Sequence, residues 1–300
     1  MTDSNNVLNQ LSGALVARAA AARTAIAAIR ISDARHLTGT LWQPDAVVAS
    51  EQSLPDNDEF DLIVSDGSVV KAKLAGRDPG SNVALLKLAR PVSPPSIVAG
   101  DAVVGALVLA VGSDGAGGAT ARLGVVNVAG PEWHSQAGGR IDRRIELDIR
   151  LGHAEEGGPV FDADGRCLGM TTFGVRTQVL VIPSATIERV VPLLLKEGRV
   201  VRGWLGVALQ PVAIPDALQS EAGQSSGMMV MSIVDGGPAA KAGLVAGDIV
   251  LSVNDAPTRR LRRLASQLGP ESIGRNAAVR VIRGGAIVSL QAVIEARPAA

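Results

Sequence analysis

The stretch that decides the fold is Asp148-Ile-Arg-Leu-Gly-His-Ala-Glu-Glu-Gly-Gly-Pro-Val-Phe161. The alternating segment 145–149 before it has the period of two that predicts a half-buried strand running into a loop. That loop closes on Gly157-Gly158-Pro159. After it, the turn-forming cluster 162–165 predicts a hairpin, because Asp and Gly adopt the backbone angles that tight turns need.

This strand, glycine-rich loop and hairpin resemble the nucleophile loop of chymotrypsin-like serine proteases, and most closely that of the HtrA/Deg family. In that family the loop reads Gly-Asn-Ser-Gly-Gly-Pro. The same six places here hold Ala154-Glu-Glu-Gly-Gly-Pro159. The resemblance therefore puts Glu156 at the place of the nucleophilic serine.

Two further segments carry the resemblance. Ala49-Ser-Glu-Gln-Ser-Leu54 stands where the family has Thr-Asn-Asn-His-Val-Val, which puts Gln52 at the histidine place within one residue. The segment 76–88 resembles the family's Gly-Arg-Asp-Pro…Asp-Leu-Ala-Val-Leu-Lys-Ile and puts Asn82 at the place of the aspartate. The triad-equivalent places are thus Gln52, Asn82 and Glu156.

The residues at these places cannot carry out the family's chemistry. A serine protease needs a hydroxyl nucleophile, a base that takes its proton, and an acceptor that orients the base. Glu156 has no hydroxyl, Gln52 does not exchange a proton, and Asn82 carries no charge. We therefore predict that no catalytic residue is intact.

The backbone of the same loop supplies the oxyanion hole in the family, and its N–H groups survive a change of side chain. The oxyanion-loop residues here are Ala154, Gly157 and Gly158. We state two alternatives for Glu156: its carboxylate folds toward these amides as a built-in plug, or it is merely tolerated there.

Composition limits the classes of function. With 300 residues of which 47% are hydrophobic, the chain is long enough for two domains with cores of their own. Its 29 basic and 29 acidic residues give a formal charge of zero, so we expect neither nucleic acid nor a membrane as partner. The single cysteine, Cys167, is expected to be a small buried hydrophobic residue.

The first residues predict a helix over about 5–21, because Leu8, Leu11, Leu15 and Ala19 recur at helical spacing. In the family a leading helix helps three subunits associate; the alternative is a helix packed on its own domain. We see no secretory signal and no apolar stretch long enough to span a bilayer, so we expect a cytoplasmic protein.

The last hundred residues resemble a PDZ domain. Trp204-Leu-Gly-Val207 looks like its carboxylate-binding loop, and 236–244 reads as a short helix with Pro at its start and Gly after its end. The segment 258–268 is expected to be the groove helix. The peptide-binding residues implied by the resemblance are Trp204, Leu205, Gly206, Val207, Leu261 and Leu264.

The predicted fold is mainly β: a chymotrypsin-like (trypsin-like) double β-barrel followed by an α+β PDZ domain, with a short N-terminal helix. The expected boundaries are 1–22 for the helical segment, 23–198 for the protease-like domain, 199–203 for a linker and 204–297 for the PDZ domain.

No cofactor is expected, and no metal. His153, Glu155 and Glu156 lie close in the sequence, but three ligands on one tight loop without a distant fourth do not make a metal site.

We expect a protein that binds unfolded or C-terminal peptides as a quality-control, chaperone-like or regulatory subunit. It would assemble as a homo-oligomer, a trimer by resemblance, or with an active protease relative. The alternatives are an active endopeptidase using unidentified residues and a structural oligomerisation adaptor.

Overall fold

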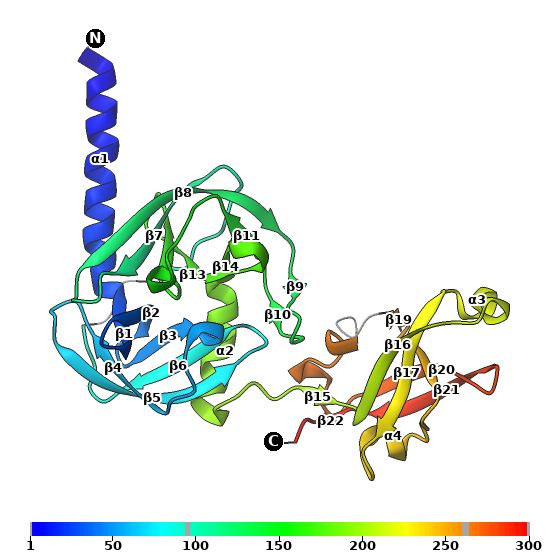
Figure 1. Ribbon diagram of the computed structural model, residues 1–300. Helices are drawn as coiled ribbons and strands as arrows, with labels where there is room; N and C mark the ends of the chain where they lie inside the picture. The colour runs from blue at the N-terminus through cyan, green and yellow to red at the C-terminus, as the bar shows by residue number, and fades with distance from the viewer. Residues whose placement is uncertain (1, 94–96, 260–263, 299–300) are drawn as a thin grey trace. The chain divides into compact units, whose positions relative to one another are not determined.

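A computed structural model describes residues 2–93, 97–259 and 264–298 (Figure 1). The chain divides into two compact units. The first contains residues 1–133 and 141–200, and the second contains 201–300 together with 134–140.

The first unit opens with a closed barrel in the strand order β1-β2-β3-β6-β5-β4. Buried apolar side chains from all six strands fill the interior of this barrel. The Asp66-Gly67 turn joins β4 to β5 as a hairpin, with Gly67 at φ 81°. The strands are β1 (Ile26–Ser32), β2 (Arg35–Gln43), β3 (Ala46–Ser50), β4 (Glu59–Ile63), β5 (Val69–Asp78) and β6 (Val83–Leu88).

A second closed barrel follows in the order β11-β14-β13-β12-β7-β8. The predicted hairpin over 162–165 joins β12 to β13. Two short strands, β9 (Trp133–His134) and β10 (Arg140–Ile141), pair with each other. The barrel strands are β7 (Leu107–Ser113), β8 (Ala119–Gly130), β11 (Arg144–Leu147), β12 (Pro159–Asp162), β13 (Cys167–Phe173) and β14 (Val179–Pro183).

Helix α2 (Ser184–Glu197) packs against both barrels. It ends at Gly198, which adopts the left-handed conformation at φ 68°, and Pro192 lies inside it. One buried cluster joins strand residues of both barrels to the apolar face of this helix, so the barrels share a core. Its members include Val48, Leu85, Met170, Ile182, Ile187 and Leu194.

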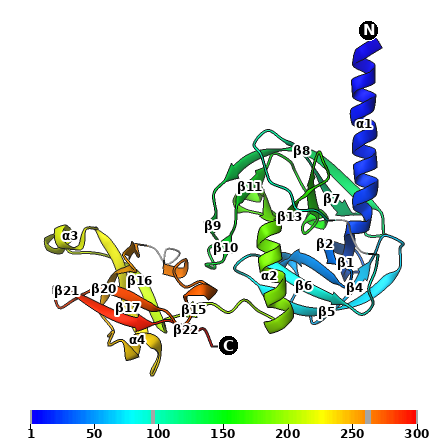
Figure 2. The same cartoon turned by 180° about the vertical axis from the view of Figure 1, so that it is seen from behind.

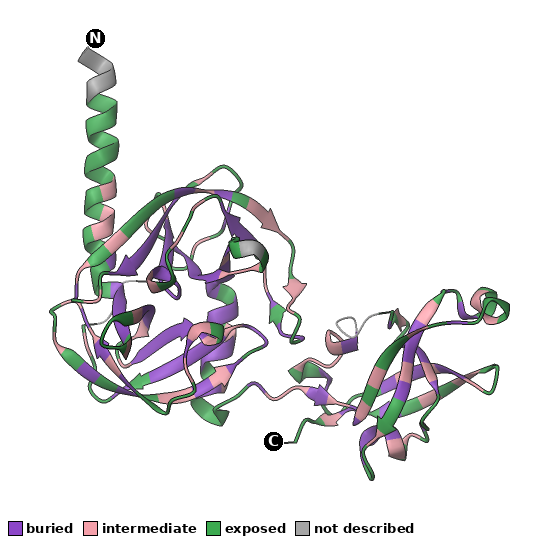
Figure 3. Cartoon of the chain, viewed as in Figure 1, coloured by how far each residue is buried: buried purple, intermediate pink, exposed green. Residues whose placement is uncertain are grey.

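Helix α1 (Thr2–Ala22) confirms the predicted N-terminal helix. Its later residues Leu15 and Ala19 pack against the second barrel, whereas Leu8 is 65% exposed. Figure 3 shows the exposed colour over most of the helix, and Figure 2 shows it from behind. Only the end of this helix is therefore covered by its own unit. Among the described residues, no helix is both long and apolar enough to cross a membrane.

The second unit is built on a sheet in the order β16-β17-β18-β20-β21, with β19 beside β18 and a separate pair β15-β22. Its predicted short helix is α4 (Pro238–Lys241), with Pro238 at the first position. A further helix, α3 (Asp216–Ala222), was not predicted. The strands are β15 (Gly203–Trp204), β16 (Val207–Ala213), β17 (Ser226–Ile233), β18 (Ile249–Val253), β19 (Ala256–Pro257), β20 (Asn276–Arg283), β21 (Ala286–Val293) and β22 (Glu295–Ala296).

One buried ion pair crosses this sheet. The Asp248 carboxylate, with 1% of its side chain exposed, accepts hydrogen bonds from the Arg283 guanidinium at 2.8 and 2.7 Å and from Val245 N–H at 2.9 Å. Burial tends to raise the pKa of Asp248, but the Arg283 and Val245 hydrogen bonds outweigh it and hold the pKa below its usual range. The native unit thus favours the ionised carboxylate.

We expect Asp248→Asn to lower the free energy of unfolding of this unit by about 1–3 kcal/mol at pH 7, because Arg283 loses its anionic partner. A depressed pKa contributes stability that is present above the unfolded value of about 3.9 and is lost as pH falls through the native value. The variant and the parent should therefore converge below about pH 4. Amide exchange at β17 and β18 in the full chain measures this.

The control for this prediction is Lys196→Gln, which breaks the exposed pair with Glu197 and should change stability by less than about 0.5 kcal/mol. A difference between Asp248→Asn and the parent that stays the same from pH 7 to pH 3 would contradict the assignment.

Candidate functional site

The loop between β11 and β12 forms a 3₁₀ turn at His153–Glu155 and then passes between the two barrels. Gly157 adopts φ 89°, and a Cβ there would collide with the Thr38 carbonyl oxygen, so only glycine fits. Three threonines fix the loop's carbonyl groups. Thr38 Oγ1 donates to Ala154 O, Thr40 Oγ1 to Gly157 O at 2.9 Å, and Thr171 Oγ1 to Glu155 O at 3.0 Å.

Glu156 directs its side chain into the cleft between the barrels and is only 1% exposed. Its Oε1 accepts hydrogen bonds from Ser50 Oγ at 2.7 Å, Gln52 Nε2 at 2.8 Å and Thr172 Oγ1 at 3.0 Å. Its Oε2 accepts one from Ser53 Oγ at 2.5 Å. All four donors are neutral, so hydrogen bonds rather than an ion pair compensate the buried carboxylate.

Asn82 completes this network from the other side. It adopts φ 57°, a left-handed conformation that asparagine tolerates better than most residues. Its side-chain oxygen accepts from Gln52 N–H at 2.8 Å, and its Nδ2 donates to Thr172 Oγ1 at 2.7 Å and Ser50 Oγ at 3.1 Å. The three residues aligned with the triad places therefore lie in one connected network.

The structure does not place the Glu156 carboxylate against the loop amides, which was the first of the two alternatives stated for this residue. Glu156 N–H donates to His153 O at 3.3 Å, Gly157 N–H to Thr171 O at 3.0 Å and Gly158 N–H to Glu155 O at 3.3 Å. These donors pair with backbone carbonyls, while the carboxylate pairs with side chains of the cleft. The Glu156 carboxylate accepts hydrogen bonds from the Gln52 amide and from three hydroxyl groups that the sequence analysis did not single out.

The network contains residues that the sequence did not single out, namely Ser50, Ser53 and Thr172. Ser53 follows Gln52 directly, so the one-residue uncertainty in the alignment covers two residues that both reach Glu156. Ser50 and Ser53 could have been found from the sequence, because they belong to a run of polar residues at the end of the buried strand β3. Nothing in the local pattern marked Thr172, since its contact depends on the pairing of the two barrels.

The histidines lie elsewhere. The His153 ring is exposed and meets Phe173 edge-on at 5.4 Å, and His36 Nε2 lies 3.0 Å from the Ser113 carbonyl oxygen. Within the described residues, no group of three or more His, Cys, Asp or Glu side chains is placed to hold a metal. Cys167 is fully buried, and burial raises the pKa of its thiol to about 11, in keeping with the predicted small hydrophobic residue.

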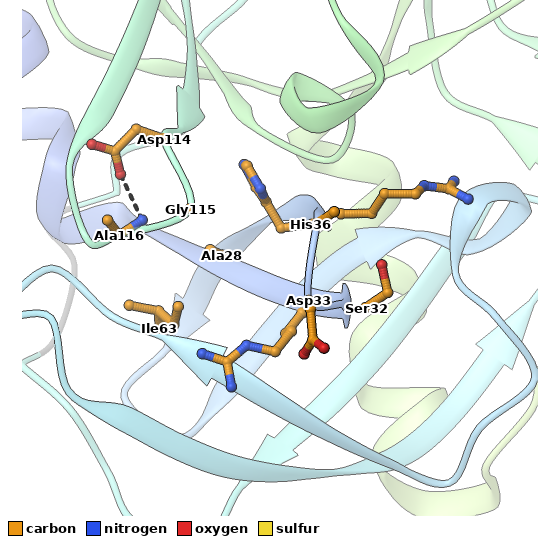
Figure 4. Close-up of a pocket in the computed structure, with 11 residues that line it drawn as sticks. Ala28, Ser32, Asp33, His36, Ile63, Asp114, Gly115 and Ala116 are labelled. Carbon is orange, nitrogen blue, oxygen red and sulfur yellow. Dashed lines mark hydrogen bonds between the residues drawn. The ribbon is translucent and has the colours of Figure 1, made fainter.

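His36 also lines a hollow of about 360 Å³ between the β1–β2 turn and the loop after β7 (Figure 4). Its walls carry both signs of charge, from Arg30, Arg35, Asp33 and Asp114. Backbone hydrogen bonds from Ala116 and then Gly118 lower the pKa of Asp114. This hollow is lined by neither Gln52, Asn82 nor Glu156.

The segment that the sequence analysis predicts to bind a carboxylate, residues 204–207, lies near the start of the second unit. The carbonyl oxygens of Leu205 and Gly206 accept hydrogen bonds from Ala239 N–H and Val234 N–H, both at 2.9 Å. Because a trans peptide holds its C=O and N–H on opposite sides, the N–H groups of Gly206 and Val207 face the other way. Gly206 has φ 75°, and the half-buried Trp204 ring lies against it.

The strand after this loop, β16, stands at the end of the sheet order and pairs with β17 on one side among the described residues. Val207 and Leu209 of β16 pack toward the same apolar core as Leu264, which is 5% exposed. Leu261 lies outside the described residues, as do the other residues of the segment 260–263 in the predicted groove helix.

Comparison with known families matches both parts of the chain. Residues 37–170 match the family of the trypsin-like peptidase domain, and residues 203–294 match the PDZ domain. Two closed barrels followed by a PDZ domain define the class of the protein, and confirm the predicted fold class.

Curated relatives carry the same two-part arrangement over most of this chain. A "Probable periplasmic serine endoprotease DegP-like" of Brucella suis biovar 1 (strain 1330) is 34% identical over 262 residues, covering 84% of this chain and 50% of the relative. The protein of the same name from Bartonella henselae is 30% identical over 263 residues, covering 84% and 51%. The chain thus spans about half the length of the curated relatives it matches.

Solved structures agree in fold. An HtrA-type protease AlgW with a decapeptide superposes with a TM-score of 0.73 at 22% identity, over 95% of this chain and 99% of that one. The serine endoprotease from Yersinia pestis gives 0.72 at 21% identity, over 95% and 98%. Together with the curated relatives, these matches show that the chain belongs to the HtrA/Deg family.

The expected cytoplasmic location is wrong. The curated relatives from Brucella, Bartonella and Rhizobium meliloti are all named periplasmic, which points to the periplasm. The expectation rested on the composition of the first thirty residues, which fold as α1 and the start of β1 and carry no information about compartment.

We expect Glu156→Ala to lower the free energy of unfolding by about 1–3 kcal/mol, because Ser50 and Thr172 are left buried without their acceptor. Glu156→Gln keeps the shape of the side chain and one acceptor oxygen. The loss of one acceptor destabilises the fold and the removal of a buried carboxylate stabilises it, so the free energy of unfolding should change by less than about 1 kcal/mol. Urea unfolding of the full chain measures both. Equal losses for the two variants would show that the network does not depend on the acceptor.

Proposed function

We propose that this HtrA/Deg homologue binds polypeptide without cleaving it. The observation that carries the proposal is the hydrogen-bonded network of Gln52, Asn82 and Glu156 at the triad-equivalent places. A carboxylate that accepts four hydrogen bonds is not a hydroxyl nucleophile, and Gln52 uses its amide as a donor toward it. The cleft therefore provides polar contacts for a chain but no route to an acyl-enzyme.

Peptide capture by the second unit is the positive half of the proposal. The N–H groups of Gly206 and Val207 would bind a terminal carboxylate, and β16 would accept the peptide as an added strand. The apolar side chains of Leu209 and Leu264 would receive an apolar last residue. One solved structural neighbour is titled as an HtrA-type protease with a decapeptide, which is in keeping with peptide binding by this architecture.

Such a protein would serve as a quality-control, chaperone-like or regulatory subunit in the class of pseudoproteases. Exposed Leu8 and Leu11 of α1 offer a surface for association with further copies or with an active protease relative. Both types of oligomer belong to this proposal. The rival function, a working endopeptidase, would draw on the Ser53 hydroxyl beside the Glu156 carboxylate.

Incubation of the full-length protein with casein should yield no cleavage products, because the cleft offers neither an imidazole base nor a serine at the nucleophile place. The matched controls are Glu156→Gln and Ser53→Ala, which should behave like the parent. Cleavage by the parent that disappears in either variant would establish the rival endopeptidase.

A peptide with a free carboxyl end should bind at least tenfold more tightly than its amidated form, because the amide loses the charge that the loop N–H groups recognise. Gly206→Ala should abolish this preference, since its Cβ would meet the Trp204 ring at 3.1 Å in a left-handed backbone. Gly223→Ala is the control, because Gly223 has φ 69° with no atom within 4 Å. Titration calorimetry measures all six affinities, and equal affinity of the parent for both peptides would favour a purely structural adaptor.

A further inference from the structure

The second glutamate of the loop, Glu155, is also buried but faces away from the cleft network. It is 6% exposed, and its Oε1 accepts a hydrogen bond from Arg122 Nε at 2.9 Å and another from Thr120 Oγ1 at 3.2 Å. Its Oε2 accepts one from Gly152 N–H at 2.7 Å. Unlike Glu156, this carboxylate has a cationic partner, contributed by β8.

The Glu155 side chain packs closely against the neighbouring barrel strands. Gly112 of β7 lies against it, and a Cβ at Gly112 would come within 2.8 Å of Glu155 Cγ and 3.1 Å of its Cα. The same Cβ would lie 2.9 Å from Thr120 Oγ1. The absence of a side chain at Gly112 therefore leaves the space that Glu155 occupies beside β7 and β8.

The anchored side chain belongs to the last residue of the 3₁₀ turn. Glu155 N–H donates to Gly152 O at 3.0 Å, so the backbone and the side chain of Glu155 both bind the same residue. In this turn Glu156 N–H is directed to His153 O. A serine protease uses the N–H of its nucleophile residue to bind the oxyanion. The turn therefore withdraws that donor from any peptide carbonyl in the cleft.

We propose that Glu155, Arg122 and Thr120 form an anchor that holds the loop in the turn in which the Glu156 amide is unavailable. Glu155 and Arg122 are positioning residues, since they act through the backbone of Glu156. In the loop sequence of the family, the place of Glu155 holds Asn, which offers Arg122 no charge. The anchor is separate from peptide binding by the second unit, because it gives a cause for the hydrogen bond that occupies the Glu156 N–H group.

Amide exchange, followed residue by residue by NMR on the full chain at fixed pH, tests the anchor. In Arg122→Gln the amides of Glu155 and Glu156 should exchange at least tenfold faster than in the parent. Arg122→Lys keeps the charge and should give an intermediate rate. Arg166→Gln, which removes an exposed pair with Asp164, should leave both rates unchanged.

The amides of β13 report on global stability and should not change. Exchange at Glu155 and Glu156 within twofold of the parent in Arg122→Gln would overturn the proposal, as would an equal acceleration in β13. Should Arg122→Gln fail to fold, Thr120→Val removes one neutral hydrogen bond from the anchor and is expected to accelerate the two amides about threefold; no acceleration there would also overturn it. Because the readout is exchange, the result is independent of whether casein is cleaved.

Discussion

The buried carboxylate of Glu156 is the constraint on which the centre of this molecule depends. A carboxyl group at 1% exposure is stable only if its oxygen atoms are hydrogen-bonded, and here donors from both barrels supply the hydrogen bonds. Ser50 and Ser53 come from the first barrel and Thr172 from the second. The two halves of the first unit are thus joined through hydrogen bonds to Glu156.

The rest of the loop is fixed by its backbone rather than by its charge. Gly157 lets the chain approach the Thr38 carbonyl, and the hydroxyl groups of Thr38, Thr40 and Thr171 donate to the carbonyls of Ala154, Gly157 and Glu155, respectively. With Glu155 tied to Arg122, the loop is held from both sides. The loop is thus hydrogen-bonded through its backbone and through both of its glutamate side chains.

Much of the fold could be predicted from local sequence. The turns at Gly67, Asp162–Gly165 and Gly284-Gly285 set the hairpins, since their backbone angles suit few other residues. The double barrel and the PDZ domain also followed from sequence motifs, whereas the assignment of Gln52, Asn82 and Glu156 to the triad places stays a prediction. The cellular compartment could not be predicted from the sequence, because the names of relatives carry that information and the residues of α1 do not. The helix α3 was missed because its seven residues are too few for a helical period to stand out.

The sequence by itself determined the order of the elements, the double barrel with its PDZ domain, and the identities of Gln52, Asn82 and Glu156. Only the tertiary structure decided where the Glu156 carboxylate points, because its donors are 16 to 106 residues away in the chain and meet it only when the barrels pair. The tertiary structure likewise decided the partner of Glu155, since Arg122 reaches this side chain from β8. Hydrogen-bond partners of buried charges are set by packing in three dimensions, and no local periodicity encodes them.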